Sequence, residues 1–120
     1  MSGKKEIGFL GEDAANKYLM DNGYKILQRN FRTRFGEIDI IAKEGKYLVF
    51  IEVKTRKSIG FGFPRESVDG YKQCRIKNVA NLYMAKKRMV DSYVRFDVVE
   101  VIVDGRNELK SVVLIKDAFE

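Results

Sequence analysis

The sequence predicts an α/β protein in which helices flank a mixed β-sheet. Patterns of apolar residues typical of helices and of strands follow one another in the order α-β-β-β-α-β-β. The 120 residues are enough for one compact domain and too few for two ordinary ones, so residues 1–120 are expected to form a single domain. The hydrophobic fraction of 45% and the charged fraction of 33% are typical of a globular protein.

The first half of the chain is expected to contain one helix and three strands. Ile7–Met20 has apolar residues at helical spacing, and the Asn22-Gly23 pair that follows is a helix-stop signal. Three strands are expected after it, at Tyr24–Phe31, Glu37–Ala42 and Tyr47–Lys54. The segment Lys43–Lys46 lies between the last two strands and is typical of a hairpin turn.

The second half of the chain is expected to contain one helix and two strands. Thr55–Ser67 is rich in glycine and contains the proline, so it is predicted to be a loop, and Asp69–Arg88 has a helical pattern. Val94–Val103 and Leu109–Ile115 are predicted strands joined by a turn at Asp104–Asn107. Their valine-rich parts, Val98–Val103 and Val112–Ile115, suit core strands and a homodimer interface equally, so the choice between monomer and homodimer stays open.

Missing residue types narrow the chemistry. The chain has no histidine, which excludes Ser-His-Asp triads, Cys-His dyads and zinc sites built on histidine. The single cysteine, Cys74, allows no internal disulfide and is expected to be an inert helix residue in a reducing cytoplasm. No apolar run approaches the length of a membrane span or a signal core, so no membrane contact is expected. The net charge of +6 favours a polyanionic partner.

The central hairpin is predicted to carry a metal site. If Ala42 pairs with Tyr47 across the turn, strand alternation puts Asp39, Glu52 and Lys54 on one face of the sheet. Asp39 and Glu52 then become diagonal neighbours, roughly 7–8 Å apart along the backbone. Two carboxylates, a backbone carbonyl and waters are a suitable set of oxygen ligands for Mg²⁺, and Lys54 could orient a bound water. The alternative is a solvated strand face on which Lys54 pairs with Glu52.

Several segments together resemble a known family. They are GEDAANKYL at Gly11–Leu19, GYKILQRNFR at Gly23–Arg32, GEIDIIA at Gly36–Ala42, LVFIEVKTR at Leu48–Arg56 and PRESV at Pro64–Val68. In this combination the chain resembles the PD-(D/E)xK endonuclease-like superfamily. More narrowly it resembles the YraN-like family of small bacterial proteins, relatives of archaeal-type Holliday junction resolvases. The resemblance covers nearly the whole chain and implies a restriction-endonuclease-like fold.

The resemblance also implies a set of site residues. Asp39, Glu52 and Lys54 match the catalytic motif, although the proline of the superfamily's name is absent from this sequence. Glu12 matches an additional acid of resolvase-like members, but an acid near the start of a helix is also favoured by the helix dipole alone. With Asp39 and Glu52, the Val53 carbonyl is a candidate ligand for Mg²⁺ or Mn²⁺. The implied activity is a metal-dependent deoxyribonuclease that hydrolyses phosphodiester bonds, with branched or otherwise structured DNA as one substrate class.

Basic residues around the acidic strands are candidate nucleic-acid contacts. The candidates are Arg29, Arg32, Arg34, Arg56, Lys57, Lys72 and Arg75. Their alternative roles are ordinary ones, namely a solvated loop, an ion pair with Glu37, or helix charges that serve solubility. Phe61 and Phe63 also have two possible roles, which are stacking on a base and packing in the core.

The excess positive charge is concentrated in one part of the sequence. From Lys54 to Arg88 there are ten basic and two acidic residues, which gives +8, and the rest of the chain sums to −2. This favours DNA as the partner. The alternative function is a nucleic-acid-binding module with the same fold and little or no turnover. A weaker third interpretation is a basic adaptor for a protein partner.

Overall fold

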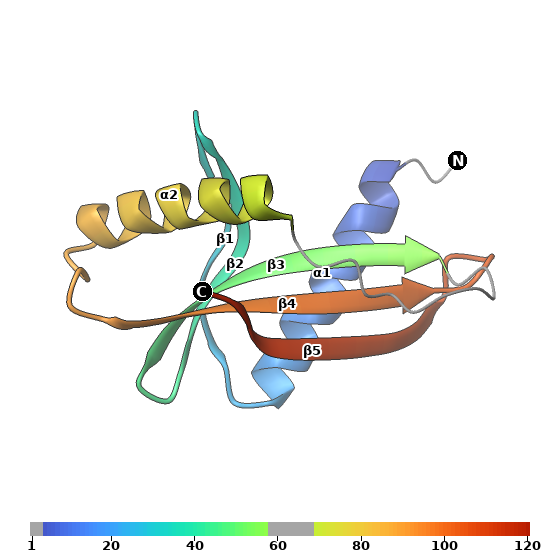
Figure 1. The fold of residues 1–120 in the computed structure, drawn as a ribbon. Coiled ribbons are helices and arrows are strands. Elements are labelled where there is room, and N and C mark those ends of the chain that lie inside the picture. The colour runs from blue at the N-terminus through green and yellow to red at the C-terminus, as the bar shows by residue number, and fades with distance from the viewer. Residues whose placement is uncertain (1–3, 58–68) are drawn as a thin grey trace.

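The structure is a computed structural model that describes residues 4–57 and 69–120, with side chains from residue 10 onward. Over these residues the chain forms two helices and five strands (Figure 1). In chain order they are α1 (Lys4–Asp21), β1 (Lys25–Thr33), β2 (Gly36–Glu44), β3 (Tyr47–Lys57), α2 (Gly70–Lys86), β4 (Tyr93–Val103) and β5 (Leu109–Phe119). The predicted α/β class, with a mixed sheet and flanking helices, is confirmed.

The five strands form one sheet in the order β1-β2-β3-β4-β5. All neighbouring pairs are antiparallel except β3 and β4, which run parallel. A parallel pair needs a crossover connection, and α2 lies in the segment that links these two strands. In this strand order β3 is the central strand of the sheet, as its continuous apolar sequence indicates.

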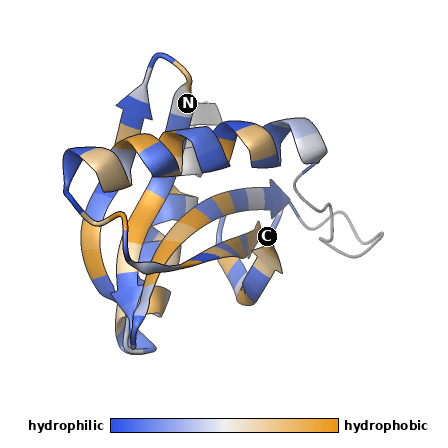
Figure 2. Cartoon of the chain, turned by 60° about the vertical axis from the view of Figure 1, so that its left-hand side comes forward, coloured by the Kyte–Doolittle hydropathy of each residue, from blue (hydrophilic) through white to orange (hydrophobic). Residues whose placement is uncertain are grey.

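The helices pack on opposite faces of the sheet and bury two clusters of side chains. The cluster beneath α2 contains Ile41, Leu48, Phe50, Val79 and Tyr83 among its members. The cluster beneath α1 contains Ala15, Leu19, Val49, Ile51 and Val99 among its members. In Figure 2 the strands between the helices are largely hydrophobic, whereas α2 alternates between hydrophobic and hydrophilic residues. Most of the valine-rich stretch of β4 is buried in these clusters.

The register of the central hairpin differs from the prediction. Ala42 pairs with Val49 rather than with Tyr47, and Tyr47 pairs instead with Glu44. The predicted four-residue turn is too long, because both strands continue to a connection made of Gly45 and Lys46 alone. The difference is two residues, and since side chains alternate with a period of two, the predicted faces are unchanged.

Several boundaries also differ from the prediction. Thr55–Lys57 belongs to β3 and not to the predicted loop, while the remainder of that loop, with Phe61 and Phe63, lies outside the described residues. Asp69 does not belong to α2 but caps it, and its carboxylate accepts a hydrogen bond of 2.8 Å from the Lys72 N–H. The described helices include none that is long and apolar enough to cross a membrane.

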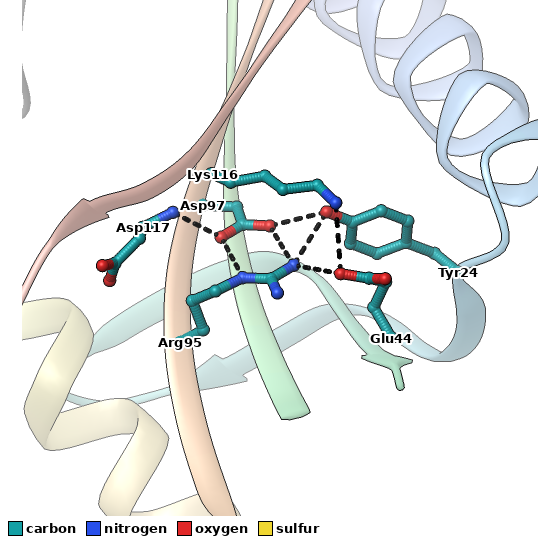
Figure 3. Close-up of polar contacts among 6 residues, drawn as sticks. All are labelled: Tyr24, Glu44, Arg95, Asp97, Lys116 and Asp117. Carbon is teal, nitrogen blue, oxygen red and sulfur yellow. Dashed lines mark hydrogen bonds and ion pairs between the residues drawn. The ribbon is translucent and has the colours of Figure 1, made fainter. Parts of the chain in front are cut away.

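A buried polar network ties together the end of the sheet where β3 and β4 begin (Figure 3). Arg95 donates from Nε and Nη2 to the two carboxylate oxygens of the fully buried Asp97, both at 2.9 Å. Tyr24 donates to Asp97 at 2.8 Å, and Arg95 Nη2 also contacts Glu44 at 2.9 Å. The Asp117 N–H donates to Asp97 at 2.9 Å. The Asp97 carboxylate and the Arg95 guanidinium of β4 therefore connect this strand to β2, to β5 and to the residue before β1.

Candidate functional site

The strands β2 and β3 separate from each other before either strand ends. Their pairing stops at Ile40 and Ile51, although β2 stays paired with β1 as far as Gly36. The strand β3 meanwhile stays paired with β4 as far as Lys57. The β1–β2 hairpin consequently bends away from the rest of the sheet, which is visible in Figure 1. This separation opens a gap in the sheet beside the residues that the sequence identifies as the site.

Asp39 lies at the point where the two strands separate. Its neighbours Ile38 and Ile40 pack in the clusters beneath α2 and α1 respectively, although residues two apart normally share a face. The strand therefore turns at Asp39, and the carboxylate accepts a hydrogen bond of 2.8 Å from the Val53 N–H. A side chain thus replaces the backbone carbonyl of a neighbouring strand. Since N–H and C=O of one extended residue point to the same side, the Val53 carbonyl also faces the gap.

The gap leads into a pocket of about 200 Å³ on the α2 side of the sheet. Its described lining residues are Gly36, Glu37, Asp39, Glu52, Lys72, Arg75 and Ile76. Asp39 is only 8% exposed and Glu52 only 9% exposed. The structure therefore brings together the two carboxylates that the sequence places on one face. Their register positions, one residue beyond the last pair, are directly opposite each other rather than diagonal.

The environment of Asp39 disfavours its ionised form. Burial, followed by the Glu52 carboxylate, raises the pKa of Asp39 from 3.8 to about 8. The Val53 N–H opposes this shift, while Glu12 and Glu37 add to it. At neutral pH the carboxyl therefore holds a proton unless a cation binds beside it. An additional positive charge would favour the ionised form.

Lys72 supplies a positive charge to the other carboxylate. It lies in the first turns of α2, and its ammonium forms an ion pair with Glu52 Oε1. The sequence predicts Lys72 as a phosphate contact, but no sequence signal indicates its pairing with Glu52 across the sheet–helix interface. The ammonium occupies part of the coordination space of Glu52, so a metal ion and Lys72 would compete for this carboxylate.

Arg75 connects α2 to the β1–β2 turn. Its Nε donates a hydrogen bond of 3.3 Å to the Phe35 carbonyl, and its guanidinium lies 5.8 Å from the centre of the Tyr71 ring. The guanidinium also passes over Gly36, where an added Cβ would lie 3.3 Å from Arg75 Nη2. Gly36 has a φ of 142°, a backbone conformation that favours glycine. The glycine therefore leaves room for an arginine that lines the pocket.

Lys54 and Glu12 lie farther from the pocket than the two central acids. Neither residue is among the described residues that line the pocket. Lys54 nevertheless follows Glu52 by two positions on the same face of β3. Gly11, which is not among the predicted site residues, lets α1 approach β3 closely. A Cβ at Gly11 would lie 1.8 Å from Thr55 Oγ1. A glycine inside a helical pattern is the signal that identifies such a contact.

Two of the predicted nucleic-acid contacts form ion pairs within the chain. Arg29 contacts Asp13 of α1 at 2.8 Å, on the opposite side of the sheet from α2. Arg32 contacts Glu37 at 2.9 Å, and both side chains are well exposed. The ion pair named as the ordinary alternative for Glu37 is therefore present, and Glu37 lines the pocket as well.

The remaining predicted contacts lie at three places, namely the β1–β2 turn, the end of β3 and α2. Arg34 lies in the β1–β2 turn, with its guanidinium 4.9 Å from the centre of the Phe35 ring. Arg56 and Lys57 lie at the end of β3, where Arg56 is half-buried and Lys57 is exposed. Lys72 and Arg75 are the two predicted contacts that line the pocket.

The donors at the gap fit a hard divalent cation. Asp39 and Glu52 supply carboxylate oxygens, and the Val53 carbonyl faces the same space. Within residues 10–57 and 69–120, no three acidic or cysteine side chains lie close enough to hold an ion together. Mg²⁺ usually keeps several waters and needs only one or two carboxylates, so the observed set is compatible with it.

Comparison with known proteins gives a family without an assigned activity. Residues 11–101 match the sequence profile of UPF0102, described as an uncharacterised protein family. A UPF0102 protein of Caldicellulosiruptor bescii is 54% identical over 116 residues, which cover 96% of this chain and 98% of the relative. A UPF0102 protein of Clostridium kluyveri is 50% identical, with 97% and 95% covered. One from Dictyoglomus turgidum is 44% identical, with 96% and 98% covered.

Proposed function

Since the chain belongs to the uncharacterised protein family UPF0102, the YraN-like family that its sequence resembles, we propose its function from the geometry of the gap. The proposal is a Mg²⁺- or Mn²⁺-dependent deoxyribonuclease of the PD-(D/E)xK type, which hydrolyses phosphodiester bonds. One observation carries it. Asp39 and Glu52 share a nearly buried pocket whose other side is lined by Lys72 and Arg75.

In this proposal the two carboxylates and the Val53 carbonyl hold the metal ion. When bound, the ion polarises a phosphoryl oxygen and lowers the pKa of a bound water. The raised pKa of Asp39 supports this role, because its carboxyl is buried beside a second carboxylate and an added cation would favour its ionised form. Glu12 assists from α1 through its charge, which already acts on Asp39.

The basic residues of the pocket bind and orient the phosphate. The Arg75 guanidinium matches the geometry of two phosphate oxygens, and it is held in place by the Phe35 carbonyl. Lys72 transfers its contact from Glu52 to a phosphate oxygen when the ion binds. Lys54, two residues beyond Glu52 on β3, orients the attacking water and stabilises the negative charge on the phosphoryl oxygens in the transition state.

The proposed partner is DNA, with branched or otherwise structured forms among the substrates. The excess of basic residues between Lys54 and Arg88 supports a polyanionic partner. A cytoplasmic location fits the one cysteine, Cys74, which is exposed as a free thiol. If two copies pair on a junction, the edge strand β5 offers exposed apolar side chains at Leu109 and Val113.

A cleavage panel tests the proposal. Purified protein is incubated with linear, flap and four-way DNA, in Mg²⁺, in Mn²⁺ and in EDTA, and the products are separated on denaturing gels. Cleavage is expected only with metal, and Glu52→Ala and Lys54→Ala are expected to abolish it. Lys110→Ala, an exposed charge change on the edge strand β5, is the matched control and should retain it. Cleavage that survives Glu52→Ala would overturn the assignment.

A second candidate is a DNA-binding module with little or no turnover. The Lys72–Glu52 ion pair favours it, because an internal cation already neutralises one of the two proposed ligands. A module of this kind would bind DNA with a steep dependence on salt and would cleave none of the panel. It would also show no change in melting temperature on addition of Mn²⁺, whereas the nuclease would be stabilised.

A further inference from the structure

Two exposed aromatic residues are adjacent in sequence to residues that line the pocket. Phe35 lies in the β1–β2 turn next to the pocket residue Gly36, and Tyr71 lies in α2 next to the pocket residue Lys72. Phe35 is 47% exposed and Tyr71 is 76% exposed. Neither ring belongs to the two buried clusters of the sheet, so neither is required to fill the core.

An arginine lies beside each of the two rings. The Arg34 guanidinium lies 4.9 Å from the centre of the Phe35 ring, and that of Arg75 lies 5.8 Å from the centre of the Tyr71 ring. Arg75 also donates to the Phe35 carbonyl at 3.3 Å. The same guanidinium that lines the carboxylate pocket thus contacts both the Phe35 backbone and the Tyr71 ring.

Exposed rings beside fixed guanidinium groups suit a particular ligand. Successive bases of a single strand stack on aromatic side chains, while arginines hold the phosphates between them. A base within a duplex is already stacked on its neighbours and cannot make this contact without being extruded. A neutral apolar peptide would offer no anionic partner to the charges of Arg34 and Arg75. The charge around the rings therefore favours a nucleic acid over a protein.

We propose that Phe35 and Tyr71 form a stacking platform for unpaired bases of DNA immediately beside the carboxylate pocket. The preferred substrate is then DNA in which the nucleotides flanking the scissile phosphate are unpaired, as in a flap or a single-stranded gap. The statement about the scissile phosphate rests on the proposed nuclease function. The statement about base binding rests on the two rings and their arginines alone.

Binding without turnover tests the platform. Fluorescence anisotropy is measured in EDTA with a labelled 20-nucleotide single strand and with a blunt duplex of the same length. Phe35→Ala and Tyr71→Ala are each expected to weaken binding of the single strand roughly 5- to 100-fold. Duplex binding should change less than about twofold, because the phosphate contacts remain. Tyr71→Phe keeps the ring and should bind the single strand as the wild type does.

Tyr93 provides a matched control. It is a tyrosine 63% exposed at the start of β4, and the Lys46 ammonium lies 4.8 Å from its ring centre. Tyr93→Ala should leave both affinities unchanged. Equal losses on single strand and duplex, no loss on either, or an equal effect of Tyr93→Ala would each overturn the platform.

The two proposals fail in different ways. If the DNA panel is cleaved but Phe35→Ala and Tyr71→Ala bind the single strand normally, the platform is wrong and the nuclease assignment stands. If nothing is cleaved but the selective loss is observed, base binding stands and the nuclease assignment fails. A 2-aminopurine base in the single strand gives an independent check, because stacking on Tyr71 would quench its fluorescence and Tyr71→Ala would restore it.

Discussion

Asp39→Asn is expected to stabilise the metal-free protein, although it removes a central residue of the candidate site. Burial and the neighbouring Glu52 carboxylate raise the pKa of Asp39 from 3.8 to about 8. At neutral pH the unfolded chain carries an ionised carboxylate, and folding forces this group to take up a proton. The free energy of unfolding is lowered by this proton uptake, and an asparagine avoids it.

The size of the effect follows from the two pKa values. Each pH unit between them corresponds to about 1.4 kcal/mol. The interval from 3.8 to pH 7 is about three units, so the gain at pH 7 has a ceiling of roughly 4 kcal/mol. Local rearrangement around the charged form reduces this, and we expect a gain of about 1–3 kcal/mol. Asparagine can still accept the Val53 N–H, whereas Asp39→Ala loses that acceptor and should gain less.

The pH dependence has a definite sign. Because the folded-state pKa of Asp39 is raised, the penalty is absent below 3.8, grows as the pH rises and is complete above about 8. Asp39→Asn and wild type should therefore have nearly equal stabilities at pH 4. Their difference should increase up to pH 8.

Urea denaturation followed by circular dichroism, in EDTA from pH 4 to pH 8, measures this difference. The control is Asp21→Asn, whose side chain is 63% exposed and paired with Lys17 at the next turn of α1. It should change the free energy of unfolding by less than about 0.5 kcal/mol and show no such pH profile. A less stable Asp39→Asn at pH 7, or a gain that does not vary with pH, would refute the reasoning.

Three further substitutions test other contacts. Lys72→Met removes the cation that competes for Glu52, so Mn²⁺ should bind up to about 5-fold more tightly by calorimetry, and weaker binding would contradict this. Gly11→Ala should lower the free energy of unfolding by about 1–3 kcal/mol in urea, because the methyl group would clash with Thr55 Oγ1. An increase, as expected for alanine in an open helix, would show that α1 lies farther from β3. Tyr24→Phe removes a donor from the buried network and should cost about 1–2 kcal/mol in the same assay; an unchanged urea midpoint would mean that the network adds no stability.

Much of the fold is predictable because the secondary structure follows local sequence patterns. Apolar spacing identifies both helices, and runs of β-branched residues identify the strands, which then extend beyond the predicted bounds by a few residues. The predicted register of the central hairpin was wrong, because the composition of Lys43–Lys46 does not determine how many of these residues form the turn. The faces were nevertheless right, since the error of two residues preserves alternation. Asp39 and Glu52 could be placed together for this reason alone.

The features that sequence reasoning missed depend on contacts between distant segments. Lys72 meets Glu52 only because α2 returns across the sheet, and a helical lysine has no pattern that specifies its partner. The separation of β2 from β3 is not apparent from the sequence either, because the isoleucines of Gly36–Glu44 are typical of a regular strand. The ion pair of Arg29 with Asp13 of α1 is likewise not revealed by an arginine-rich segment, whereas the Arg32–Glu37 pair was among the predicted alternatives.

The hydrogen bond from the Val53 N–H to the Asp39 carboxylate makes one backbone amide a spectroscopic probe of the site. The β3 amides in the regular pairing with β2 and β4 donate instead to backbone carbonyls, which do not ionise. The proton resonance of Val53 would instead move when Asp39 ionises and again when a cation withdraws electron density from its oxygens. A single crosspeak in an amide correlation spectrum would thereby report protonation and metal occupancy at the centre of the gap, without any substrate.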